Sequence, residues 1–457
     1  MIIILLLLLF LYEPSISIFF SGDDWFHLRV SNIANIHQFL NFFSFSRNEQ
    51  TIAFYRPLST QVFFFTFQKL FGLNPIPFHI FSLIVFGVSV YIFKKISSIL
   101  FTSETQSLVA TIVFAFASSN ITRIYFLSHF QEIALVFLSL LALYSYMEGH
   151  RYRTILFFIL ALMSKETAVV LPAILVLYDW SIKKINFRKL IPFGLVVLPY
   201  LYLRFKVFGG ADGETYSWIF SPVRALNTFM WYGLWSVGAP ELLLDYIGPG
   251  LRPIPRFFTD FPFWWRLIIW PLILNIIFIL ILFIKRIRTV DRQLIIFVAS
   301  FVVSLCPVLF LPEHKFAVEL GLPMVWFSLF IAKLLSENKM VSVAFIASFL
   351  ILNIPMNILT SQRHYSVGRA IVSKKVYDFV KTNYPIKPQN SYFEFINDSV
   401  AYTKEWGSSR QISNSIQGSE MFRYIYHDPN YVVYFEDNPL RVPVNSNKII
   451  LSSKKFL

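Results

Sequence analysis

The sequence predicts an all-α polytopic membrane bundle followed by a small extracytoplasmic α+β domain at the C-terminus. First, 56% of the 457 residues are hydrophobic and only 14% are charged, whereas about 25% of residues are charged in an average soluble domain. Second, long apolar runs recur along the chain, and about 20 apolar residues suffice to cross a bilayer. Third, the chain turns polar after residue 359. This composition excludes an ordinary soluble enzyme, a disordered chain and a fibrous protein.

The apolar segments follow one another from the first residue onward. Residues 1–20 are interrupted only by Glu13 and Pro14, and they lack the basic start and small-residue cleavage site of a signal peptide. We therefore interpret them as the first membrane helix. Further spans are predicted over residues 78–93, 107–121, 127–147, 190–208, 264–284, 293–311, 317–335 and 340–358.

Basic residues between the spans predict the orientation, because Lys and Arg concentrate in cytoplasmic loops. The formal net charge of +14 is expected to reflect these loops and not a nucleic-acid partner. We expect a multi-pass protein of the cell membrane whose N-terminus is cytoplasmic. The expected cytoplasmic clusters are Lys94 and Lys95; Arg151 and Arg153; Lys183, Lys184, Arg188 and Lys189; Lys285, Arg286, Arg288 and Arg292; and Lys333 and Lys339.

Residues 154–182 lie between two of these basic clusters and are too few for two passes of about 20 residues each. We predict two short, non-spanning helices that turn near Lys165, giving about eleven helical segments in all. Such irregular backbone at membrane depth requires protein or a wet cavity around it. The alternative is one long tilted helix with a satisfied Lys–Glu pair, which would invert every later loop.

The domain organisation follows from these spans. Residues 1–359 form the predicted membrane domain, with outer loops at 21–77 and 209–263. Residues 360–457 are rich in Asn, Ser, Tyr and mixed charges, and we expect them outside the cytoplasm. The alternating run 431–435 predicts a strand in this tail.

The first outer loop carries two candidate features. Asp23 and Asp24 follow the first helix directly, and two adjacent carboxylates raise the pKa of one of them, which suits a general base or a metal ligand. The alternative is a solvated turn with Trp25 at the membrane interface. Arg56 is suited to anchoring a phosphate through its two-pronged guanidinium, although a contact with a lipid headgroup is the plainer interpretation.

Three further polar groups fall on the same predicted side of the membrane. His129 and Glu132 share a helix face at a spacing of three residues. No third ligand is evident, so we predict no zinc site, while assistance by Mg or Mn stays open. Lys165 and Glu166 occupy the turn described above. The other group, in a short outer turn, is Glu313, His314 and Lys315, which alternatively are only solvated loop residues.

These motifs, in this order, resemble those of the GT-C superfamily of membrane glycosyltransferases. The motifs are GDDW (22–25), YRPLS (55–59), PFHIFSLIVF (77–86), HFQE (129–132) and SKETAVVLPAILVLYDW (164–180), with weaker support from PEHK (312–315). The closest likeness is to the protein O-mannosyltransferase-like branch, which includes the TMTC-type mannosyltransferases. The tetratricopeptide repeats of the TMTC proteins have no counterpart here, which leaves the acceptor open.

The resemblance implies a bundle with short non-spanning helices, an extracytoplasmic cavity and a polyprenyl-phosphate sugar as donor. It implies that Asp23 or Asp24 is the base of an inverting displacement, and that Arg56 and Lys165 hold the donor phosphate. The residues implied to line the substrate pocket are His129, Glu132, Glu166 and His314, and we add Glu313 and Lys315 from the same outer turn.

We therefore predict a glycosyltransferase that moves a hexose, such as mannose, from the lipid donor to a hydroxyl of an acceptor protein or glycan. No nucleotide-binding signature occurs in the chain. The alternative is a transporter or flippase for a lipid-linked or amphiphilic substrate, which should place ionisable residues near the middle of the bilayer. A third hypothesis is a membrane scaffold without catalysis, which needs no aspartate pair.

Overall fold

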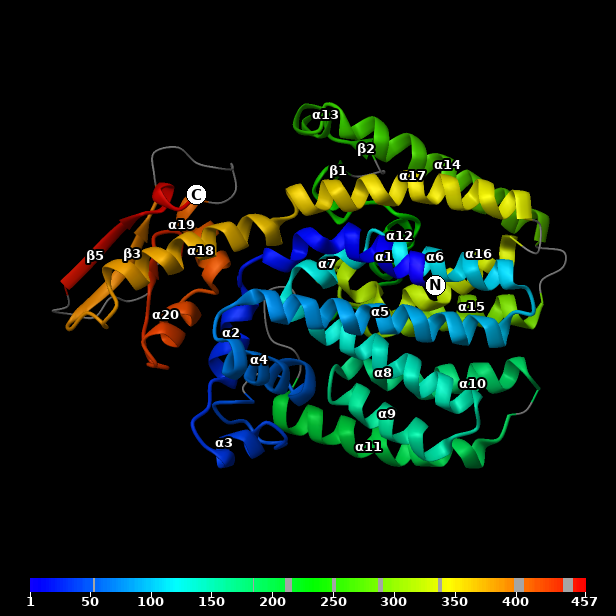
Figure 1. Ribbon diagram of the computed structural model, residues 1–457, viewed down its shortest axis with the longest axis horizontal. Helices are drawn as coiled ribbons and strands as arrows, with labels where there is room; N and C mark the ends of the chain where they lie inside the picture. The colour runs from blue at the N-terminus through cyan, green and yellow to red at the C-terminus, as the bar shows by residue number, and fades with distance from the viewer. Residues whose placement is uncertain are drawn as a thin grey trace.

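The computed structural model describes residues 1–51, 54–183, 185–209, 216–248, 252–286, 291–335, 339–397, 407–438 and 447–457. The described part is mostly helical, as the composition predicts (Figure 1). It begins with α1 and a 3-10 turn, η1, and continues through the first outer loop. The elements of this part are α1 (Ile2–Tyr12), η1 (Glu13–Ser17), α2 (Asp23–Ser31), α3 (Ile36–Asn41), the π-helical turn η2 (Pro57–Val62) and α4 (Phe63–Phe71).

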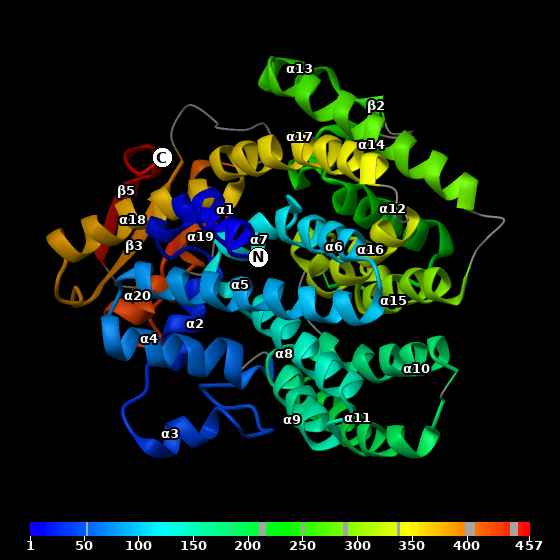
Figure 2. The same ribbon diagram turned by 45° about the vertical axis from the view of Figure 1, so that its right-hand side comes forward.

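The bundle follows in the middle of the chain. In Figures 1 and 2, α14 and α17 lie side by side at one edge, and α9 and α11 lie at the other. Between them α8 packs against α5 and α9, and α16 packs against α6 and α15. The bundle elements are α5 (Pro75–Leu100), α6 (Glu104–Phe116), α7 (Asn120–Tyr125), η3 (Leu127–His129), α8 (Phe130–Met147), α9 (Arg151–Leu162), η4 (Glu166–Val170), α10 (Leu171–Ser181), α11 (Phe187–Phe208), α12 (Pro222–Val237), η5 (Glu241–Asp245), the hairpin β1 (Ile247–Gly248) and β2 (Arg252–Pro253), α13 (Pro255–Asp260), α14 (Trp264–Arg286), α15 (Arg292–Leu309), η8 (Ala317–Leu320), α16 (Gly321–Leu335) and α17 (Lys339–Arg363).

Within the described residues, seven helical stretches are long and apolar enough to cross a membrane. They agree with the corresponding spans predicted from hydropathy, so the prediction of a multi-span helical protein is confirmed at this level. The predicted spans 1–20 and 107–121 coincide with the shorter apolar helices Ile2–Ser17 and Glu104–Phe116. The seven stretches are Pro75–Leu100, Leu127–Met147, Arg188–Phe208, Trp264–Arg286, Arg292–Leu309, Ala317–Leu335 and Lys339–Asn383.

Helix ends that neighbour the basic clusters meet at one end of the bundle. Lys94 Nζ lies 2.7 Å from the Glu104 carboxylate. Lys333 Nζ lies 2.7 Å from both Asp291 Oδ2 and Gln293 Oε1. We refer to this end as the basic end of the bundle.

The segment 154–182 leaves the basic end and returns to it. Met147, Ser181 and Gln293 line one small pocket there. Met147 precedes α9 and Ser181 ends α10, so the chain has returned to the same end of the bundle between these two residues. The chain turns between these helices at Lys165, whose backbone is extended (φ −158°, ψ 139°). The prediction of two short helices at this place is confirmed, and the alternative of one long tilted helix is wrong.

The C-terminal part contains a small parallel sheet. Its strand order is β4-β3-β5, and Phe395 pairs with Phe435 while Phe393 pairs with Ile449. The strand predicted at 431–435 is present as its last two residues. The elements are α18 (Tyr365–Asn383), β3 (Ser391–Ile396), α19 (Ser408–Ile416), α20 (Glu420–Ile425), β4 (Tyr434–Phe435), β5 (Asn447–Ser452) and η9 (Ser453–Lys455).

This C-terminal part packs directly on the first outer loop. The indole N–H of Trp25 donates to Ser373 Oγ at 2.8 Å, and the backbone N–H of Gly22 donates to the Ser415 carbonyl at 2.8 Å. The boundary predicted at 359/360 falls inside α17, which continues to Arg363. The tail is therefore joined to the first outer loop by hydrogen bonds as well as to α17 by the chain.

Candidate functional site

Residues from three distant segments meet around Arg56, which is itself buried. Its Nε donates to Glu166 Oε2 at 2.7 Å and its Nη2 donates to Glu166 Oε1 at 2.5 Å. Its Nη1 donates to the Gln131 side-chain oxygen. The two-pronged pairing with Glu166 and the bond to Gln131 together use three of the five N–H groups of the guanidinium, and the other two have no hydrogen-bond partner among the described residues.

A second charged group surrounds Lys165, which is also buried. Its ammonium donates to Glu132 and, at 2.9 and 2.8 Å, to the two carboxylate oxygens of Glu319. His314 Nε2 lies 3.8 Å from Glu319 Oε1. The three protons of the ammonium are thereby occupied, so Lys165 acts as the centre of a buried ion triad.

Two irregular stretches of backbone hold these groups in place. The Leu58 N–H donates to the Met163 carbonyl at 3.2 Å, and Ser59 Oγ donates to the Ser164 carbonyl at 2.6 Å. The π-helical turn that begins at Pro57 is thus bonded to the turn before Lys165. Because neither stretch is a regular helix, each leaves backbone groups that the other can satisfy.

The two adjacent aspartates have different environments. Asp24 is buried, and its two oxygens accept the backbone N–H groups of Ser21 at 2.9 Å and Ser128 at 2.6 Å. Burial raises its pKa to about 8 against the opposing effect of these N–H groups. Asp24 therefore connects the first outer loop to the start of α8 and has no free oxygen facing solvent.

Asp23, by contrast, is exposed at the first position of α2. Desolvation by the surrounding protein raises the pKa of its carboxyl, while the positive charges of Arg369 and Arg56 oppose the rise. Arg369 lies on α18 with its guanidinium 4.6 Å from the centre of the Tyr365 ring. The exposed carboxyl of Asp23 therefore interacts electrostatically with a cation of the first outer loop and with one of the C-terminal part.

The remaining predicted residues divide into two sets. His129 is half-buried beside the cluster, and its Nδ1 lies 2.8 Å from the Thr122 carbonyl. Glu313 and Lys315 are bound to α12 instead: Glu313 lies 3.8 Å from Arg224, and Lys315 donates to Asn227 at 3.2 Å. These two do not contact the Arg56 and Lys165 groups.

The sequence analysis missed Glu319, Gln131 and Arg369. Glu319 had a signal, since it is a carboxylate at the start of a predicted span, where ionisable groups usually have a partner or a role. Gln131 stands inside the HFQE motif but is uncharged. Arg369 lies in the tail, and only the packing of α18 on α2 brings it to the site.

Among the described residues, no group of three or more His, Cys, Asp and Glu side chains is arranged to hold a metal ion. Two of the carboxylates in the site, Glu132 and Glu319, are bound to Lys165. This arrangement offers no ready ligand set for Mg or Mn, and we derive no step through a divalent cation.

Comparison with protein-family models gives no match for this chain, and comparison with curated proteins gives none either. The functional argument therefore depends on the residues and their geometry.

Proposed function

We propose that the chain is an integral-membrane glycosyltransferase that moves a hexose from a polyprenyl-phosphate donor to a hydroxyl of an acceptor. The observation that carries the proposal is Asp23, an exposed acid at the start of α2 whose charge interacts with those of Arg56 in the first outer loop and Arg369 in the C-terminal part, and whose pKa is raised. A general base works best when its pKa is near the working pH. Cations beside it suit a donor whose leaving group is a phosphate.

In this mechanism Asp23 accepts the proton of the acceptor hydroxyl as its oxygen attacks the anomeric carbon. The bond from that carbon to the phosphate oxygen breaks, and the phosphate leaves with the electron pair. The configuration at the anomeric carbon inverts because the displacement is single. The two spare N–H groups of Arg56, together with Arg369, stabilise the charge that develops on the phosphate. Lys165 positions Glu132 and Glu319. Because its three protons are already bonded to these carboxylates, we do not assign it a direct contact with the donor phosphate.

The proposed location follows from the charges at the two ends. The basic end of the bundle is assigned to the cytoplasm by the distribution of Lys and Arg. The site and the C-terminal part then face outward, where a lipid-linked donor and an acceptor protein or glycan are available. The apolar helix faces fit a lipid bilayer.

The test is transfer from radiolabelled polyprenyl-phosphate mannose and related hexose donors by the purified chain in proteoliposomes containing a membrane extract. Asp23→Asn should lower the rate 10²–10⁴-fold, the usual contribution of a general base, without changing thermal stability. The control is Glu148→Gln, which changes an exposed acid after α8, near the basic end, and should leave the rate unchanged. Full activity of Asp23→Asn would refute the proposed mechanism.

The second candidate is a transporter or flippase. One observation favours it: Glu132 and Glu319 lie on candidate spans and share Lys165 between them, and buried ionisable groups in membrane helices often mark a substrate path. Movement of a fluorescent polyprenyl phosphate across proteoliposomes, unaffected by Asp23→Asn, would support this function and exclude the transferase.

A further inference from the structure

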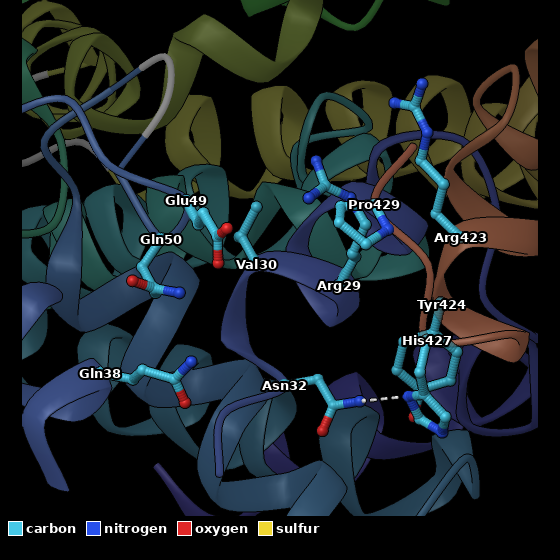
Figure 3. Close-up of a pocket in the computed structure, with 10 residues that line it drawn as sticks. All are labelled: Arg29, Val30, Asn32, Gln38, Glu49, Gln50, Arg423, Tyr424, His427 and Pro429. Atoms are coloured by element: carbon cyan, nitrogen blue, oxygen red, sulfur yellow. Dashed lines mark hydrogen bonds between the residues drawn. The ribbon is translucent and has the colours of Figure 1, made fainter. Parts of the chain in front are cut away.

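A polar pocket of about 190 Å³ lies between the first outer loop and the C-terminal part (Figure 3). Residues 29–50 form one side of it and residues 423–429 form the other. The pocket is close to the candidate base along α2. Arg29 follows Asp23 by six residues, which is about 9 Å along a helix axis at about 1.5 Å per residue.

The two arginines that line this pocket are already paired. Arg423 Nη1 lies 2.8 Å from Glu420 Oε1, and Arg29 is bound to the other oxygen of the same carboxylate. Glu420 is not among the lining residues, whereas Glu49 adds a carboxylate at the pocket wall. Counted together, these two guanidinium groups and two carboxylates carry no net charge, so the pocket offers little electrostatic attraction to a phosphate or another anion.

The remaining polar groups present donors and acceptors together. The Gln50 side-chain oxygen accepts from Asn41 at 3.4 Å, which leaves its NH₂ group without a partner among the described residues. The Asn32 NH₂ group is 3.5 Å from His427 Nδ1, and the Asn32 side-chain oxygen has no hydrogen-bond donor among the described residues. Glu49 likewise has no partner within the described part of the chain. Hydroxyl groups, which both donate and accept, match such a mixture.

An aromatic wall completes the pocket. The rings of Tyr424 and His427 lie 6.4 Å apart, and both line the cavity from the C-terminal side, facing the loop residues (Figure 3). Aromatic rings offer an apolar face beside a polar edge. A sugar ring has the complementary form, because its C–H groups form an apolar face and its hydroxyls surround the rim.

We propose that this pocket binds one ring of a neutral carbohydrate. In combination with the proposed transferase activity, on which this step rests, the pocket is an acceptor subsite and the acceptor is a glycan. In this proposal a ring seated here directs the neighbouring part of the same glycan along α2 toward Asp23, since Arg29 at the pocket wall and Asp23 belong to the same helix. The C-terminal part thereby takes a direct part in choosing the substrate.

The test measures carbohydrate binding to the full chain in lipid nanodiscs by saturation-transfer NMR and calorimetry. The probes are methyl α-D-mannopyranoside, methyl α-D-glucopyranoside and mannotriose, with inorganic phosphate and a Ser/Thr-rich peptide for comparison. The double variant Asn32→Ala/Glu49→Ala should weaken binding of at least one sugar by tenfold or more. Neither side chain holds a strong contact elsewhere, so the fold should persist, and Glu148→Ala is the matched control.

The outcomes separate this inference from the proposed function. Asp23→Asn should abolish transfer and keep sugar binding, whereas Asn32→Ala/Glu49→Ala should raise the KM for a glycan acceptor with little change in kcat. Sugar binding without any transfer would reject the transferase and retain the pocket. Unchanged sugar binding in the double variant, or binding of phosphate or peptide in place of sugar, would overturn the inference.

Discussion

Replacing Lys165 by Met should destabilise the protein strongly, because Lys165 is the cation between two buried carboxylates. Glu132 and Glu319 keep only 1% and 9% of their side-chain surface exposed, and the Lys165 side chain keeps 5%. Removing one partner of a buried ion pair costs about 3–5 kcal/mol, since the other charge remains without compensation. At about 2.1 cal/mol/K of unfolding entropy per residue, a chain of 457 residues should lose about 4 °C of melting temperature at the middle of that range.

The measurement is the melting temperature of the purified protein in detergent, followed by tryptophan fluorescence. The matched control is Lys374→Met, because Lys374 forms an exposed pair with Asp378 at 2.9 Å and such pairs contribute about 0–1 kcal/mol. Adding Glu132→Gln and Glu319→Gln to Lys165→Met should restore part of the loss, since the two buried carboxylates are then gone, while the buried Arg123 loses the opposing charges of both. Equal melting temperatures of Lys165→Met and the control would refute the buried ion triad.

Three other predictions concern the first outer loop. Gly22→Ala should destabilise by about 1–3 kcal/mol in chemical denaturation, because Gly22 has φ +51° and an added Cβ would lie 3.2 Å from the Phe126 ring. Trp25→Phe should cost about 1 kcal/mol through the lost bond to Ser373 and should speed limited proteolysis of the C-terminal part; unchanged cleavage would contradict that contact. Burial raises the pKa of Asp24 to about 8, so the stability from its protonated carboxyl is complete below about pH 4 and is lost as the pH rises through 8. Asp24→Asn should therefore flatten the decrease in unfolding free energy between pH 4 and 9, and an unchanged slope would show that Asp24 does not titrate there.

The bundle was largely predictable because its signal is local. A span reveals itself by its own apolar length, so the stretches Trp264–Arg286 and Arg292–Leu309 coincide closely with their predicted counterparts. The turn at Lys165 was predictable for a related reason, since two basic flanks and a short separation leave one simple solution. The end of α17 was less predictable, because the hydropathy falls near residue 359 whereas the helix continues to Arg363.

The candidate site was predictable only in part because it is built from contacts between distant segments. Sequence order indicated that Arg56, Glu132 and Lys165 share one side of the membrane, but not that each cation is already paired. Glu313 and Lys315 show that residues predicted on the same side of the membrane need not belong to the same site. They share a short turn with His314, yet they bind α12, because neighbouring side chains in a tight turn point in different directions.

The contact between Trp25 and Ser373 joins positions 348 residues apart, and this has a consequence for biosynthesis. At about 5–20 residues per second, Trp25 leaves the ribosome roughly 20–70 s before its partner is made. During that interval the indole of Trp25 lacks its hydrogen-bond partner, and the C-terminal part that packs beside Asp23 has not yet been made. A chain whose translation stops early would insert its helices and still lack the finished loop, so completion of synthesis itself controls when the acid is set in place.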